Sequence, residues 1–184
     1  MRLIVLLLIG LLGLGCDRQN PGREQATGST RPAKGVDRSH KGETAPATLF
    51  EDPDGADFSL AGLKGSPVLL NLWASWCAPC VKELPTLDQL AVEQDGKLAV
   101  IAVSQDMAPQ SSVTAFLKQH GVGNLDAYHD PEMGLTSALG VQIMPTTVLY
   151  DSVGKEVWRF AGDLDWTSPE ASKLLSEASP ATAH

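Results

Sequence analysis

Two cysteines stand three positions apart in the segment WASWCAPC, residues 73–80. A pair with this spacing could supply half of a zinc site, form a structural disulfide, or exchange disulfides with other molecules. A zinc site needs four ligands, and the chain has no second cysteine pair and no closely spaced histidines. A disulfide between Cys77 and Cys80 would close a loop too small to constrain the unfolded chain much. We therefore expect redox chemistry at this pair, with no metal and no cofactor.

The residues around the pair place it where a strand is followed by a helix. The apolar run at 67–73 is typical of a strand that is buried on both faces, and Pro79 suits the first turn of a helix beginning near Cys77. The free N–H groups and the positive dipole end of such a helix stabilise a thiolate. We therefore expect Cys77 to attack a substrate disulfide and the more shielded Cys80 to resolve the mixed disulfide.

The elements that must position this pair follow an alternating pattern without an internal repeat. A Pro-Asp-Gly turn signal separates segments 48–50 and 57–60, which predicts a short hairpin. The apolar runs at 67–73 and 97–104 flank a helical stretch, which predicts a βαβ unit. Further along, the pattern predicts helices over 111–120, 131–139 and 168–178, and strands over 125–128, 146–150 and 156–161.

The first 45 residues differ in composition from the rest. The start, MRLIVLLLIGLLGLGC, has the layout of an export signal, and it resembles a bacterial lipoprotein signal in which Cys16 is acylated. We therefore expect a signal peptide at 1–15. A plain cleaved signal, which would give a soluble periplasmic protein, and an uncleaved signal anchor stay open as alternatives. Residues 17–45 contain no aromatic residue, so 16–45 is interpreted as a lipid-anchored flexible linker. A domain at 46–178 and a disordered tail at 179–184 complete the predicted organisation.

The combination WASWCAPC, KELP at 82–85 and GVQIMPTTVLYDSVGKEV at 140–157 resembles the TlpA/ResA-like branch of the thioredoxin superfamily. That branch, which carries redoxin or AhpC-TSA-like domains, consists of membrane-anchored protein disulfide oxidoreductases that face the bacterial periplasm or the cell exterior. The resemblance implies an α/β, thioredoxin-like fold. Its central mixed sheet would be flanked by helices, with an N-terminal β-hairpin and an inserted α/β element.

The resemblance also implies roles for residues near the cysteines. Pro145 occupies the place of a cis proline beside the pair, so the backbone of Met144 would face the Cys77 sulfur and pair with an extended substrate. Glu83 lies on the same helix face as Cys80 and would transfer its proton, because Asn71 stands where thioredoxin has a buried aspartate. Trp76 is expected to shield the sulfur and to contact substrate.

The charge distribution limits the partners of the predicted domain. From residue 46 onward the chain carries seven basic and eighteen acidic side chains, a formal net charge of −11, which excludes nucleic acid as an expected partner. The resemblance implies disulfide-containing exported proteins as substrates, a membrane-spanning thiol reductase as electron donor, and contact with the periplasmic side of the inner membrane through the N-terminal lipid. It favours reduction, for instance during cytochrome c maturation.

Two other functions remain open from the sequence. A thiol peroxidase of thioredoxin fold would have a Pro-x-x-x-Thr/Ser-x-x-Cys loop, and neither Cys77 nor Cys80 follows one, because Ala74 and Cys77 occupy the hydroxyl positions. A non-catalytic binding module on the same scaffold is the second alternative.

Overall fold

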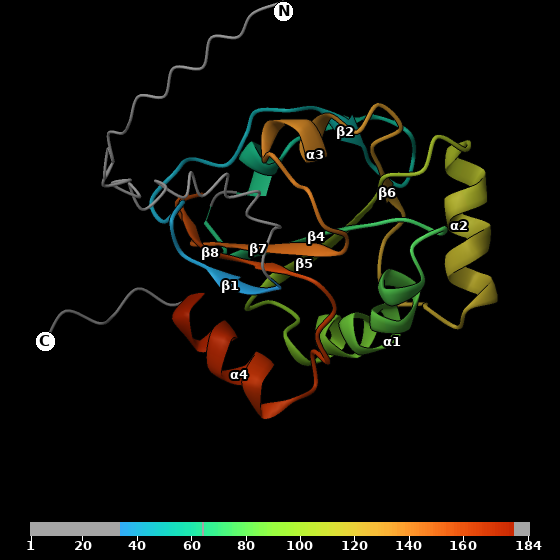
Figure 1. Cartoon of the computed structure of the whole chain (residues 1–184). Helices are drawn as coiled ribbons and strands as arrows, with labels where there is room; N and C mark the ends of the chain where they lie inside the picture. The colour runs from blue at the N-terminus through green and yellow to red at the C-terminus, as the bar shows by residue number, and fades with distance from the viewer. Residues whose placement is uncertain (1–33, 64, 179–184) are drawn as a thin grey trace, which may run out of the picture. The chain divides into compact units, whose positions relative to one another are not determined.

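The structure is a computed structural model that describes residues 34–63 and 65–178. Its centre is an eight-stranded mixed sheet in the order β1-β8-β7-β4-β5-β6-β2-β3 (Figure 1). The strands are β1 (Gly35–Asp37), β2 (Phe50–Glu51), β3 (Asp57–Phe58), β4 (Val68–Trp73), β5 (Ala99–Ser104), β6 (Tyr128–His129), β7 (Thr146–Tyr150) and β8 (Glu156–Ala161). The α-helices are α1 (Ala78–Glu93), α2 (Gln110–Gln119), α3 (Gly134–Ala138) and α4 (Pro169–Leu175), and η1 (Leu60–Leu63) and η2 (Ser176–Ala178) are 3-10 helices.

The strand that leads to the cysteine pair lies in the middle of the sheet. β4 pairs in parallel with β5 and antiparallel with β7, and every residue of β4 is buried. This agrees with its nearly continuous apolar sequence, which is typical of a strand covered on both faces. The predicted βαβ unit is therefore confirmed as β4-α1-β5.

The two faces of the sheet bury separate apolar clusters. Successive side chains of a strand point to opposite faces. Leu69 and Trp73 accordingly pack in the cluster that includes residues of α1, α2 and α4, whereas Leu70 and Leu72 pack with residues of η1 and α3. Figure 1 shows α1 and α4 on one side of the sheet and α3 on the other. The predicted fold class is thus confirmed.

The hairpin and the inserted element also agree with their predictions. β2 and β3 pair antiparallel, and the Asp52 carboxylate between them accepts hydrogen bonds from the backbone N–H groups of Asp54 and Ala56. β2 also pairs with β6, which joins the hairpin to the sheet. The inserted element consists of α2, β6 and α3, so it adds one strand beside β5.

The predicted start of the domain at residue 46 is wrong. β1 pairs antiparallel with β8, Gly42 and Ala45 donate backbone hydrogen bonds to residues of the β7–β8 hairpin, and Arg38 forms an ion pair with Glu177. The linker interpretation relied on the polar side chains of this segment. An edge strand is held largely through its backbone, which composition does not reveal.

The signal peptide, the acylation of Cys16 and the disordered tail concern residues outside those that the structure describes. Within the ranges 34–63 and 65–178, no helix combines the length and the apolar character needed to cross a bilayer.

Candidate active site

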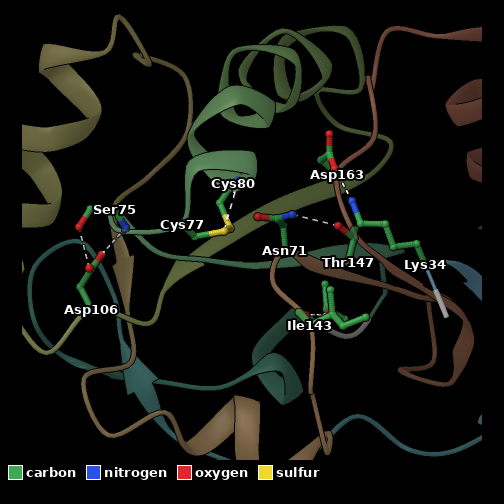
Figure 2. The surroundings of a disulfide bond; sticks show 10 residues. Lys34, Asn71, Ser75, Cys77, Cys80, Asp106, Ile143, Thr147 and Asp163 are labelled. Atoms are coloured by element: carbon green, nitrogen blue, oxygen red, sulfur yellow. Dashed lines mark hydrogen bonds and ion pairs between the residues drawn. A yellow bond between two sulfur atoms is a disulfide. The ribbon is translucent and has the colours of Figure 1, made fainter. Parts of the chain in front are cut away.

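The two cysteines form a disulfide at the beginning of α1 (Figure 2). Their Cα atoms are 5.2 Å apart, and the S–S distance is 2.05 Å. Cys77 is the N-cap residue of the helix, and its sulfur accepts a hydrogen bond from the backbone N–H of Cys80 at 3.3 Å. Cys77 is 7% exposed and Cys80 is 1% exposed, so the predicted difference in shielding has the expected direction.

The position at the helix terminus determines which sulfur is stabilised as a thiolate. The first N–H groups of α1 have no partner within the helix, and its first turn contains no acidic residue. Pro79 lies in that turn, as predicted, where its missing N–H costs no hydrogen bond. Once the disulfide is reduced, the Cys77 sulfur can receive an N–H hydrogen bond and the favourable helix dipole. This geometry suits Cys77 as the nucleophile.

Glu83 lies one turn after Cys80 on α1 and is 3% exposed. Burial away from water raises the pKa of its carboxyl group from 4.5 to about 8, although the hydrogen bond from Trp166 lowers it. The indole N–H of Trp166 donates to Oε1, while Oε2 has no hydrogen-bond partner among the described residues. A carboxyl group with a pKa near neutrality can both accept and donate a proton at physiological pH.

A pocket of about 210 Å³ lies next to Glu83 on α1, and it is lined by Lys82, Glu83, Thr86, Asp163, Leu164 and Asp165.

The segment around Pro145 has the predicted backbone. The Met144–Pro145 peptide bond is cis, and Met144 packs against the same apolar cluster that contains Cys77 and Cys80. Two residues later, the Thr147 hydroxyl accepts a hydrogen bond from the Asn71 amide at 2.9 Å, which connects β7 to β4 beside the disulfide (Figure 2). The substrate-pairing role of Met144 remains a prediction.

The four tryptophans differ in exposure. Trp73, Trp158 and Trp166 are buried in the core, whereas Trp76 is 65% exposed next to Cys77. The Trp76 ring is therefore available to a substrate. The contact of Trp166 with Glu83 was missed, because the two residues are 83 positions apart and no local pattern connects them.

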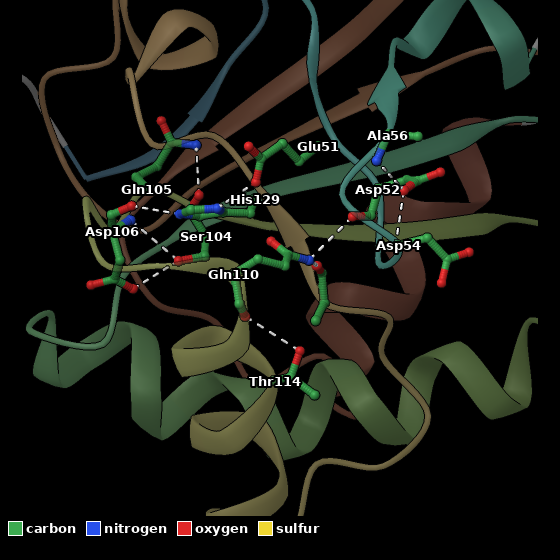
Figure 3. Close-up of polar contacts among 11 residues, drawn as sticks. Glu51, Asp52, Asp54, Ala56, Ser104, Gln105, Asp106, Gln110, Thr114 and His129 are labelled. Carbon is green, nitrogen blue, oxygen red and sulfur yellow. Dashed lines mark hydrogen bonds and ion pairs between the residues drawn. The ribbon is translucent and has the colours of Figure 1, made fainter.

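A second polar group near the pair was also missed. Ser75 donates two hydrogen bonds to the Asp106 carboxylate, and His129, which the sequence indicates as isolated, is buried between Glu51 and the backbone of Asp106 (Figure 3). These residues come from four different segments, so only the fold brings them together. Among the described residues, no group of three or more His, Cys, Asp or Glu side chains is placed to hold a metal ion.

Comparison with known proteins gives consistent matches. The Redoxin family model matches residues 40–175. Thiol-disulfide oxidoreductase ResA of Bacillus subtilis is 33% identical over 124 residues, covering 67% of this chain and 68% of ResA. Thioredoxin-like protein YneN of the same organism is 35% identical over 116 residues, covering 62% and 67%. The crystal structure of the exposed lipoprotein thioredoxin of Streptococcus pneumoniae matches with a TM-score of 0.60 and 27% identity, covering 71% of this chain and 96% of that one.

Proposed function

Because this chain belongs to the Redoxin family, in the TlpA/ResA-like branch of the thioredoxin superfamily, we propose that it reduces disulfides in exported proteins outside the cytoplasm. It is a thiol–disulfide oxidoreductase with the redox pair Cys77 and Cys80. The observation that supports the proposal most directly is the position of this pair at the N-terminus of α1, with the buried Glu83 carboxyl one turn behind it.

The proposed reaction transfers the disulfide from the substrate to the enzyme. The Cys77 thiolate attacks one sulfur of the substrate disulfide, and the other substrate sulfur leaves as a thiolate and takes up a proton. Cys80 then loses its proton to Glu83 and attacks the Cys77 sulfur, which releases the second substrate sulfur. The products are the Cys77–Cys80 disulfide and two substrate thiols, and Glu83 returns its proton to water.

Substrate binding involves the residues that surround Cys77. The exposed Trp76 ring offers an apolar contact, and the backbone of Met144 before Pro145 pairs with an extended substrate segment. Cys77 is the more exposed of the two cysteines, so it attacks first, and the shielded Cys80 acts only after the mixed disulfide has formed.

The cellular setting is the second part of the proposal. The signal-like start of the chain and the lipoprotein in the name of the S. pneumoniae relative support acylation of Cys16 and attachment to the periplasmic side of the inner membrane. Electrons would come from a membrane-spanning thiol reductase, and cytochrome c apoproteins would be one class of substrate. Mass spectrometry of the mature protein should find diacylglycerol on Cys16, and an unmodified N-terminus at another residue would contradict the anchor.

The reaction is tested by reduction of insulin disulfides with dithiothreitol. We expect the protein to accelerate this reaction and Cys77→Ser to abolish the acceleration, because the nucleophile is lost. Cys80→Ser should instead accumulate a mixed disulfide between Cys77 and the substrate, visible on a non-reducing gel. A wild-type protein without acceleration would indicate a binding module, and turnover of hydrogen peroxide would indicate a peroxidase.

The direction of electron flow is tested by the reduction potential of the Cys77–Cys80 pair in a glutathione or dithiothreitol buffer series. Thioredoxin has a potential of about −270 mV and the oxidant DsbA about −120 mV. We expect a value near that of thioredoxin, and a value near that of DsbA would contradict the reductant.

A further inference from the structure

A buried carboxylate holds the short turn that connects β4 to the nucleophile. Asp106 lies two residues beyond the end of β5 and is almost fully buried. Its Oδ2 accepts a hydrogen bond from the backbone N–H of Ser75 at 3.0 Å, and its Oδ1 accepts one from the Ser75 hydroxyl at 2.7 Å (Figure 2). Both bonds fix the turn at 74–76, which directly precedes Cys77.

The carboxylate is itself fixed by its neighbours at the end of β5. The Ser104 hydroxyl donates to Asp106 Oδ2 at 2.7 Å, and the Asp106 backbone N–H donates to the same hydroxyl at 3.2 Å. The residue between them, Gln105, donates its backbone N–H to the Trp73 carbonyl at 2.8 Å. The segment that carries Asp106 is therefore joined to the end of β4 through its backbone as well as through its carboxylate.

A histidine supports Asp106 from the neighbouring strands. His129 on β6 donates from Nε2 to the Asp106 carbonyl oxygen at 2.7 Å, since a carbonyl can only accept. Its Nδ1 is 2.9 Å from Oε2 of Glu51, which lies on β2 (Figure 3). The contacts run without interruption from the hairpin through β6 to the turn before Cys77.

We propose that Asp106 is a positioning residue that fixes the direction of the Cys77 sulfur for attack on a substrate disulfide. The inference rests on the proposed function. Disulfide exchange needs the attacking sulfur to approach along a defined direction, and orientation of this kind makes a large contribution to rate. The turn at 74–76 connects the end of β4 to Cys77, so a loosened turn would change the approach of Cys77 while leaving its thiol chemistry intact.

The test compares two reagents that differ in their need for orientation. Asp106→Asn replaces one carboxylate oxygen, which accepts a hydrogen bond from Ser75, by an NH₂ group, which can only donate. Ser75→Ala removes the hydrogen bond from the Ser75 hydroxyl, at an exposed residue, and keeps the one from its backbone N–H. The reduced proteins react at high pH, where the Cys77 thiolate is fully formed. We expect the rate constant with a peptide disulfide to fall about five- to twentyfold in both variants. The rate constant with iodoacetamide should change less than about twofold, because a small alkylating reagent needs little orientation.

Asp88→Asn is the matched control. Asp88 is also a buried carboxylate that holds a loop, since it accepts backbone hydrogen bonds from Gly123, Asn124 and Leu125. This variant should lose stability and keep both rate constants. Three results would contradict positioning by Asp106. In the first, Ser75→Ala reacts with the peptide disulfide at the wild-type rate. In the others, the rate constants with both reagents fall in parallel, or the rate constant of Asp88→Asn with the peptide disulfide falls as much as that of Asp106→Asn. A wild-type protein that does not react with the peptide disulfide would instead contradict the proposed function.

Discussion

At the scale of single residues, Glu83 carries a carboxyl group into the core beside the redox pair. Burial is the main cause of its raised pKa, and the repulsion from Asp163 at the pocket acts in the same direction. The hydrogen bond from Trp166 acts in the opposite direction, because it stabilises the ionised form. The pKa near 8 is thus a balance between burial and a small number of identified contacts.

The raised pKa of Glu83 predicts a pH-dependent stability. Between about pH 4.5 and pH 8 the folded state keeps a proton that the unfolded state has released, so stability falls as pH rises through this window. The stabilisation that comes from the protonated Glu83 carboxyl group is fully present below pH 4.5 and is lost as the pH rises through 8. In Glu83→Gln this part of the slope, at most about 1.4 kcal/mol per pH unit, should disappear. Denaturant unfolding of the oxidised protein at several pH values measures it, and an unchanged slope would contradict the burial effect.

The hydrogen bond from Trp166 predicts a shift in the pH profile of the resolving step. Trp166→Phe removes the indole N–H that lowers the pKa of Glu83, so the profile should move to higher pH. Trp158→Phe is the control, because that indole donates to the Leu174 carbonyl oxygen. Stopped-flow measurement of mixed-disulfide decay gives both profiles. Equal shifts in the two variants would mean that a general loss of packing is the cause.

Residues near each other in the sequence were predictable, and distant partners were not. Cys77, Cys80 and Glu83 share one helix, so their spacing alone places them on adjacent turns. The partners Trp166 and Asp106 lie in the segments after β8 and β5, and their types occur at many solvent-exposed or packing positions. Only the topology of the sheet brings them to the pair.

At the scale of elements, the strength of the local signal decided which predictions were correct. β4 and β5 are long apolar runs, and α4 begins with Ser168 as N-cap and Pro169 as its first residue, near the predicted start at 168. β1 has one aliphatic side chain, Val36, and was therefore missed. Its stability comes from pairing with β8, which is a tertiary contact without a sequence period.

The N-cap of α4 allows a prediction of how much one capping hydrogen bond contributes to the free energy of unfolding. The Ser168 side chain accepts a bond from the backbone N–H of Ala171 at 3.2 Å. Ser168→Ala should lower the free energy of unfolding by about 1 kcal/mol, because it leaves this N–H without its cap. Ser172→Ala, at an exposed position of the same helix, should have almost no effect. Chemical denaturation measures both, and equal values would argue against the cap.

At the scale of the whole molecule, residues 34–45 are part of the domain. Lys34 pairs with Asp163 beside the Glu83 pocket, and Arg38 pairs with Glu177 near the end of α4. Together with the β1–β8 pairing, these contacts attach the segment to the core at several places.

Truncation measures the contribution of this segment. A chain that begins at Pro46 loses the backbone bonds of β1, each worth about 1 kcal/mol, so its midpoint of thermal unfolding should lie at least about 4 °C below that of a chain beginning at Lys34. Circular dichroism at both ends of the transition would show whether the remaining sheet is intact. Identical midpoints would restore the interpretation of this segment as a linker.

Through the contact between Glu51 and His129, the β2–β3 hairpin supports the turn before Cys77 as well as extending the edge of the sheet. Replacement of this hairpin would therefore alter the contacts that support the turn before Cys77. A transplanted hairpin without an acidic side chain opposite the imidazole would leave that ring with one partner fewer. The chimera would fold and bind, yet it would react slowly until the carboxylate was restored.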